Sequence, residues 1–237
     1  MINAYLSHLK AVLKGGVALA LLSGCTRGID DRITAAYKLG RNPTDRHKNR
    51  IEALLQDADR DVRANALVVM AGVDMERATR MADGALDDPD GLVRVAAVSI
   101  LGKRDEPETR HVLASMATED PDWRVRSRAL EAFASFDDPA VREAFSRALS
   151  DPVRHVRRAA LAGGNAHPGL LPPDRLAELV LSDPDWENRV EAARALGASR
   201  DPAGAAALDA ALADPNEFVR ATAATERRAF KTVEAPR

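Results

Sequence analysis

Aspartate and arginine side chains recur in one repeated phrase, and they are the groups whose type and spacing could do chemistry. In six copies an aspartate precedes an arginine by six residues, and successive aspartates lie 31 or 32 residues apart. A carboxylate and a guanidinium can form an ion pair or take part in catalysis, but one active site has no use for six copies in phase. The repetition therefore favours a structural role. The pairs are Asp57/Arg63, Asp88/Arg94, Asp120/Arg126, Asp151/Arg157, Asp183/Arg189 and Asp214/Arg220.

The phrase has the features of a helix start. Aspartate can accept hydrogen bonds from the free backbone amides at a helix N-terminus, and the proline that follows most of these aspartates fits the first helical position. We therefore expect each aspartate to be the N-cap of a helix. An arginine six residues later is too far away for an i to i+4 contact. It should reach an aspartate or a loop carbonyl in the same or the neighbouring repeat, which would form a ladder along the stack.

A second helix is predicted in each repeat, because apolar residues between the phrases follow the helical period. An alanine also stands three residues after every phrase arginine, where it lets neighbouring helices approach closely. Two helices per repeat, joined by turns with Gly72, Gly102 and Gly197, predict an all-α fold: an α-α superhelix of six helical pairs. Stepping back one period places Arg32 on an additional N-terminal capping helix. The second helices are expected at about 44–56, 75–86, 107–118, 139–149, 173–181 and 202–212.

The shared pattern, D-P-x-x-x-V-R-x-x-A-x-x-A-L, resembles the HEAT repeats of phycobilin-lyase-like proteins over about residues 44–230. The resemblance implies a HEAT-type α-solenoid and leaves an alternative function open, that of an enzyme or enzyme accessory of this group. Repeat proteins related to deoxyhypusine hydroxylase bind di-iron through paired His-Glu motifs. This sequence has no His-Glu dipeptide, so that enzymatic interpretation lacks its ligands.

Other catalytic and cofactor motifs are missing from the sequence as well. Beyond residue 24 the histidines are His47, His111, His155 and His167, which fall in separate repeats without a cysteine partner at zinc-site spacing. No glycine-rich nucleotide motif and no G-x-S-x-G is present. We therefore expect no metal, no cofactor and no enzyme activity.

Composition and length exclude several classes of protein. The chain has 237 residues, a net charge of −2, nine aromatic residues and one cysteine. One cysteine excludes a disulfide framework, and near-neutral charge argues against a general nucleic-acid binder. The length suits one domain or one continuous array.

The only cysteine follows a segment that is typical of a secretory signal. Residues 1–24 carry lysines and no acid, then become apolar and end in Leu22-Ser23-Gly24-Cys25. This stretch resembles the lipobox of bacterial lipoproteins, which implies removal of residues 1–24 and acylation of Cys25. Residues 25–28 would then be a lipidated tether, 29–230 the solenoid and 231–237 a C-terminal tail. The alternative is that Cys25 is a small buried residue at the end of an ordinary helix.

Departures from the repeat indicate where a partner could bind. Trp123 and Trp186 occupy the same position in repeats three and five, either as exposed binding residues or packed over the preceding turn. Arg154, His155 and Arg158 form a basic cluster that could bind an acidic protein segment, a lipid head group or an anionic glycan, or could simply be a solvated face. In residues 163–173 we expect the helix to end at Gly163-Gly164, followed by a bend or a binding loop, with the bend favoured.

These features predict a membrane-anchored lipoprotein that acts as a non-enzymatic protein-binding scaffold or adaptor. Its partner is expected to be a protein, its membrane contact the lipid anchor, and no nucleic acid is expected. The resemblance to lipoproteins places it in the bacterial cell envelope, and the threonine after Cys25 favours the outer membrane.

Overall fold

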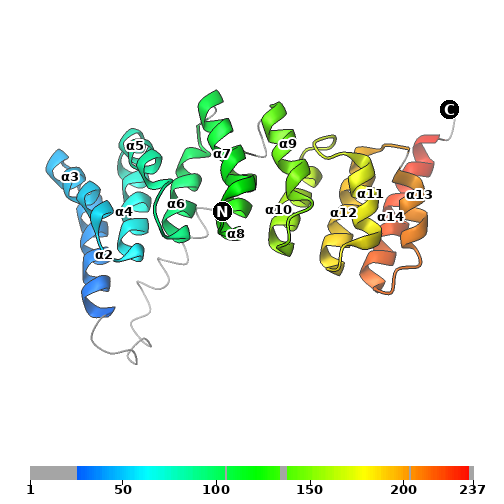
Figure 1. Ribbon diagram of the computed structural model, residues 1–237, viewed down its shortest axis with the longest axis horizontal. Helices are drawn as coiled ribbons and strands as arrows, with labels where there is room; N and C mark the ends of the chain where they lie inside the picture. The colour runs from blue at the N-terminus through cyan, green and yellow to red at the C-terminus, as the bar shows by residue number, and fades with distance from the viewer. Residues whose placement is uncertain (1–25, 105, 134–137, 203, 235–237) are drawn as a thin grey trace.

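Two rows of antiparallel helices form an arch. The computed structural model describes residues 26–104, 106–133, 138–202 and 204–234, and every regular element among them is helical. After the single helix α2 (Thr26–Arg41), the helices follow one another in pairs, with a one-turn 3-10 segment, η1 (Leu54–Gln56), after α3 (Figure 1). The predicted all-α superhelix of six pairs behind one capping helix is therefore confirmed. The pairs are α3 (Asp45–Ala53) and α4 (Arg60–Val73), α5 (Met75–Ala85) and α6 (Gly91–Leu101), α7 (Pro107–Glu119) and α8 (Trp123–Phe133), α9 (Pro139–Ala148) and α10 (Arg154–Ala166), α11 (Pro173–Ser182) and α12 (Trp186–Ser199), and α13 (Gly204–Ala211) and α14 (Glu217–Glu234).

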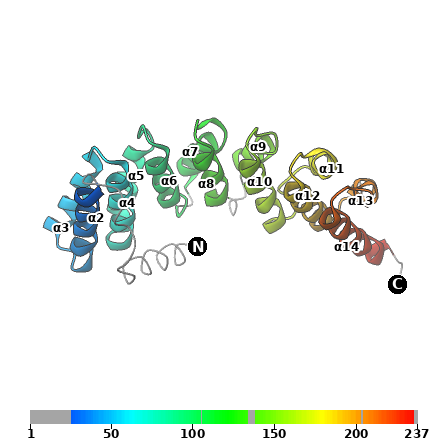
Figure 2. The ribbon, with the colours of Figure 1, turned by 90° about the horizontal axis from the view of Figure 1, so that it is seen from below.

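The even-numbered helices line the concave side of the arch, and the odd-numbered helices from α3 onward cover the convex side (Figure 2). We call these the inner and outer rows. Each inner helix packs against the next inner helix, from α2 through α14. The contact is close because the repeated alanine of each inner helix is fully buried: Ala66, Ala97, Ala129, Ala160, Ala192 and Ala223. A larger side chain at this position would force neighbouring inner helices apart.

The predicted N-caps are wrong by two residues. The inner helices α4, α6 and α12 are capped by the second acid of the phrase, Asp59, Asp90 and Asp185. The first aspartate instead accepts a hydrogen bond from the backbone N–H two residues later, as Asp57 does from Asp59 at 2.9 Å. The carboxylate of the first aspartate also binds an arginine of the preceding inner helix, as Asp57 binds Arg32 of α2, which leaves the second acid to cap the helix.

The expected early end of repeat four is also wrong, since α10 continues through both glycines to Ala166. A Cβ atom on Gly163 would lie 2.2 Å from Cε1 of Phe145, and one on Gly164 would lie 2.3 Å from Cδ1 of Leu171. These glycines therefore allow close packing inside the helix rather than ending it. Leu171, in the segment before α11, is 3 % exposed, so part of the irregular segment belongs to the core.

Two of the glycines expected in turns likewise lie inside helices. Gly72 falls in the last turn of α4 and Gly197 in the last turn of α12, whereas Gly102 directly follows α6 as predicted. A Cβ atom on Gly197 would lie 2.1 Å from a carboxylate oxygen of Glu226, so this glycine admits the side chain of the next inner helix.

Cys25 and the segment before it lie outside the described residues, so the lipobox stays a prediction. Within the part of the chain that is described, no helix combines the length and apolar character that a membrane crossing requires.

Candidate functional site

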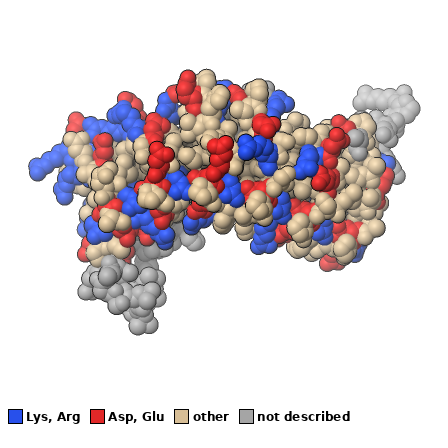
Figure 3. Space-filling model, viewed as in Figure 1, with Lys and Arg blue, Asp and Glu red and all other residues tan. Residues whose placement is uncertain are grey.

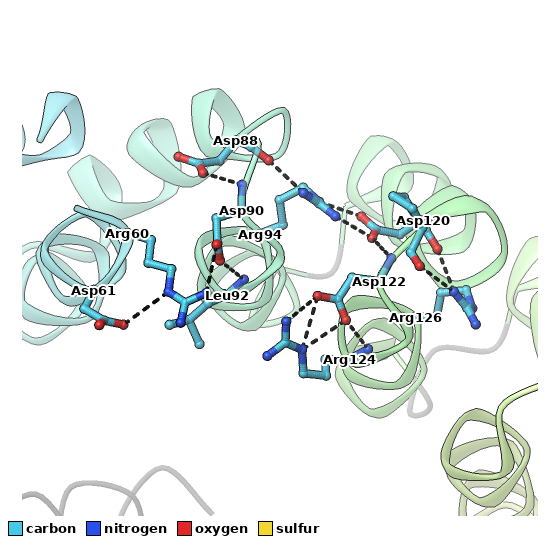
Figure 4. Close-up of polar contacts among 11 residues, drawn as sticks. Arg60, Asp61, Asp88, Asp90, Leu92, Arg94, Asp120, Asp122, Arg124 and Arg126 are labelled. Carbon is cyan, nitrogen blue, oxygen red and sulfur yellow. Dashed lines mark hydrogen bonds and ion pairs between the residues drawn. The ribbon is translucent and has the colours of Figure 1, made fainter. Parts of the chain in front are cut away.

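The phrase arginines connect each repeat to the next. Arg63 on α4 donates from Nε and Nη2 to both carboxylate oxygens of Asp88, at 2.7 and 2.8 Å, and from Nη1 to the backbone carbonyl of Asp57, at 2.9 Å. Figure 4 shows the same arrangement one repeat further, where Arg94 lies between Asp88 and Asp120. We call this row of contacts the ladder. Its other two-pronged pairs are Arg94–Asp120, Arg126–Asp151, Arg157–Asp183 and Arg189–Asp214.

The ladder begins at the capping helix. Arg32 on α2 binds Asp57, with Nε 2.9 Å from Oδ2. It is the residue obtained by stepping back one repeat from Arg63, so the capping helix supplies the first contact of the series.

The side chains of the ladder pairs are largely shielded from water. The side chains of Arg157 and Asp183 are 10 % and 0 % exposed. Burial favours the neutral form of Asp88, but hydrogen bonds from Arg63 and from the Asp90 amide more than offset it, so the pKa of Asp88 is below its usual value. The Asp88 carboxylate in turn raises the pKa of Arg63. The Arg63–Asp88 pair is therefore held ionised, as a structural element rather than a proton-transfer site.

A second set of contacts between repeats starts from the first residue of each inner helix. We call this position the slot. Arg60 and Arg154 occupy it in repeats one and four, and each donates to the N-cap aspartate of the next inner helix. The distances are 3.2 Å to Asp90 and 2.9 Å to Asp185. Both slot arginines thus have an acidic hydrogen-bond partner within the chain.

The slot tryptophans stack on aromatic rings of the next repeat. Trp123 lies against His155, with ring centroids 4.9 Å apart, and Trp186 lies against Phe218, at 5.4 Å. In both cases the next inner helix lacks an acidic N-cap. Val153 stands there in repeat four and Asn216 in repeat six. The slot therefore holds arginine in repeats one and four, where the next inner helix has an acidic N-cap. It holds tryptophan in repeats three and five, where the N-cap of the next inner helix is not acidic.

Both tryptophans remain partly open to solvent, at 38 % and 39 % exposed, and Phe218 is 56 % exposed. Trp123 also lines an open hollow of about 550 Å³ with Pro89, Pro121 and Gly91, the slot residue of repeat two, whose missing side chain makes room for the Asp122 carboxylate. His155 and Phe218 were not predicted as ring partners of the tryptophans. Comparing each slot residue with the residues one repeat further would have found them.

The basic cluster is largely neutralised inside the chain. Arg154 pairs with Asp185, Arg158 pairs with Glu187, and His155 lies under Trp123. Burial tends to raise the pKa of Asp185, but the Arg154 hydrogen bond helps to lower it overall. These contacts favour a structural role for Arg154 and Arg158. Figure 3 shows acidic and basic side chains interspersed over one broad face.

No metal site can be built from the described residues, among which no three His, Cys, Asp or Glu side chains are grouped suitably. His47 and His111 each contact a backbone carbonyl near their own helix start, that of Asn42 and that of Pro107, both at 2.8 Å.

A family model for HEAT repeats matches residues 48–133, 112–163 and 173–236. The chain belongs to the HEAT-repeat family. No curated protein matches this HEAT-repeat chain in sequence.

Solved structures share the fold. The Escherichia coli protein YibA is 21 % identical, covers 91 % of this chain and 81 % of its own, and has a TM-score of 0.62. An archaeal HEAT-like repeats protein from Thermococcus onnurineus is 17 % identical, with coverages of 87 % and 94 % and a TM-score of 0.56. The CpcE–CpcF complex of phycocyanin lyase from Nostoc is 23 % identical, with coverages of 82 % and 80 % and a TM-score of 0.43. At these identities the similarity to YibA and to the archaeal protein shows the fold alone.

Proposed function

We propose that this HEAT-repeat protein is a non-enzymatic protein-binding scaffold, tethered to a membrane of the bacterial cell envelope through acylated Cys25. The observation that carries the binding proposal is the pair of aromatic stacks, Trp123 with His155 and Trp186 with Phe218, partly exposed at the starts of inner helices. Large aromatic side chains dominate the binding energy of many protein interfaces. HEAT repeats, moreover, generally mediate protein interactions.

The ladder supports this function because it fixes the spacing between the stacks. Trp123 and Trp186 stand two repeats apart, and the Arg126–Asp151 and Arg157–Asp183 pairs connect the intervening repeats. A rigid array offers a partner two anchoring positions without the entropy cost of ordering them. A folded protein or an extended segment that contacts both stacks is the expected ligand.

The binding experiment is affinity capture after crosslinking in membranes, comparing the wild type with a Trp123→Ala/Trp186→Ala variant. We expect the variant to lose a specific crosslinked partner at least tenfold, the scale of a binding hot spot. The matched control is Leu181→Ala, because Leu181 is 52 % exposed but lies on outer helix α11. Equal recovery of every partner with the double variant would refute binding through the stacks.

The membrane proposal rests on the lipobox and has its own test. Removal of residues 1–24 would leave Cys25 as the acylated first residue, directly before α2 in the sequence, so the first repeats would lie near the membrane surface. We expect Cys25→Ser to move the protein from the membrane to the soluble fraction. Separation of inner from outer membranes would test the outer-membrane assignment.

A further inference from the structure

The last arginine of the ladder is held in position but lacks its acidic partner. Arg220 donates from Nη1 to the backbone carbonyls of Asp214 and Pro215, at 2.7 and 2.9 Å, as the other ladder arginines do in their own turns. Elsewhere in the ladder, Nε and Nη2 bind the carboxylate of the following repeat. Within the described residues no carboxylate contacts these atoms of Arg220.

The two ends of the ladder are thus different. At the N-terminal end, Arg32 of the capping helix binds Asp57 and completes the first contact. At the C-terminal end, the fork of Arg220 is open and the residue is exposed. The backbone carbonyls nevertheless fix the guanidinium, so much of the side-chain ordering that binding requires has already taken place.

The surface around Arg220 continues the interface between inner helices. On α12 the corresponding residues face α14: Arg189 binds Asp214, and Gly197 lies against Glu226. One repeat later, this face of α14 consists of Arg220, Ala221, Ala224, Thr225 and Arg228. The side chains at the centre of this face are small enough for a further helix to approach closely. Arg220 and Arg228 place a positive charge near each end of the face. A stacked helical unit with an acidic turn is complementary to it.

We propose that Arg220 is a docking site for an aspartate of a partner protein, whose helical repeat stacks end-on against α14. The partner's carboxylate would accept from Nε and Nη2, as Asp214 does from Arg189 at 2.8 and 3.0 Å. This proposal rests on the scaffold function and names a second surface for it. A second copy of this chain is a poorer fit, because the residue one repeat before Asp57 is Thr26 rather than an acid.

The test uses a synthetic probe whose chemistry the chain itself defines. A peptide of residues 173–199 contains α11, the turn with Asp183 and α12. Within the chain this helical pair stacks on α10, where Arg157 binds Asp183, so it has the acidic turn that the proposed partner requires. Its binding to the purified chain is measured by fluorescence anisotropy. We expect saturable binding that weakens about tenfold with Arg220→Gln in the chain or Asp183→Asn in the peptide, with no further loss when both are changed.

The matched control is Arg80→Gln, since Arg80 is an exposed arginine on outer helix α5, away from α14, and pairs with Glu76 of its own helix. It should leave the affinity within about twofold of the wild type. No saturable binding, equal affinities for all variants, or self-association of the chain through Arg220 would each overturn the proposal. The assay needs neither the membrane nor the tryptophans, so its failure is separate from failure of the scaffold function.

Discussion

The guanidinium of Arg157 donates to both carboxylate oxygens of Asp183, at 2.7 and 2.9 Å, across the junction between repeats four and five. Asp183 is fully buried, and its own backbone carbonyl accepts from the next ladder arginine, Arg189, at 2.8 Å. Asp183 thus binds arginines of two successive repeats, Arg157 through its side chain and Arg189 through its main chain. Stability and spacing of the stack depend on such shared residues.

Removing one partner of this pair should destabilise the fold strongly. Arg157→Ala leaves the Asp183 carboxylate buried without its cation, which we expect to lower the free energy of unfolding by about 3–5 kcal/mol. Arg220→Ala is the control, because it removes an exposed ladder arginine without an acidic partner and should cost about 1 kcal/mol. Urea unfolding followed by circular dichroism measures both. Losses of equal size would contradict the assignment of the ladder as the main contact between repeats.

Acid should weaken the ladder. The pKa values of Asp88 and Asp214 are lowered in the folded state, because hydrogen bonds from the ladder arginines and backbone amides outweigh burial. Their stabilising contribution is therefore present above the unfolded-state pKa of about 3.9 and is lost as the pH falls through the folded pKa. Thermal melts from pH 7 to pH 3 should show a falling midpoint, with a shallower fall for Asp88→Asn. A midpoint that rises below pH 5 would contradict this account.

Glu226 should behave in the opposite way. Burial against α12 raises its pKa, despite the nearby charges of Arg194 and Arg200. A raised folded pKa means that its favourable contribution exists at low pH and is lost as the pH rises through that value. Glu226→Gln should therefore raise the melting midpoint at pH 7 and have little effect near pH 4, whereas the exposed control Glu217→Gln changes neither. A lower midpoint for Glu226→Gln at pH 7 would refute this explanation.

Glycines inside the helices should respond oppositely to alanine. A Cβ atom on Gly72 meets nothing within 4 Å, so Gly72→Ala should stabilise the chain by about 0.5–1 kcal/mol. Gly163→Ala would place a Cβ atom 2.2 Å from Cε1 of Phe145 and should destabilise the fold by about 1–3 kcal/mol. Unfolding free energies of the two variants compare them directly. Stabilisation by both would mean that Phe145 can move aside freely.

The periodic part of the structure could be predicted because each repeat imposes the same local requirements. The fixed spacing of Arg63 from Asp57 and Asp88 predicts a contact between repeats, and the alanine column predicts the close inner helices. Asp59 was not predicted as the N-cap, because Asp57 is equally suitable in sequence. Only the folded chain shows that Arg32 binds the Asp57 carboxylate.

Features that depend on a single tertiary neighbour could not be predicted from the period. Gly163 and Gly164 resemble a helix end in sequence, but they accommodate Phe145 and Leu171, which come from other segments. The stack of Trp123 on His155 could be predicted only by comparing neighbouring repeats, because the repeat pattern alone marks Trp123 as an exception. The exceptions to the repeat are also where the proposed binding surface lies.

The most direct test of the membrane-tethered scaffold is the distribution of a crosslink-identified partner between membrane and soluble fractions. In cells with Cys25→Ser, we predict that the chain and its partner move together into the soluble fraction. With Trp123→Ala/Trp186→Ala, we predict that the chain stays on the membrane and only the partner is released. A partner that stays membrane-bound with both variants would contradict the proposed function.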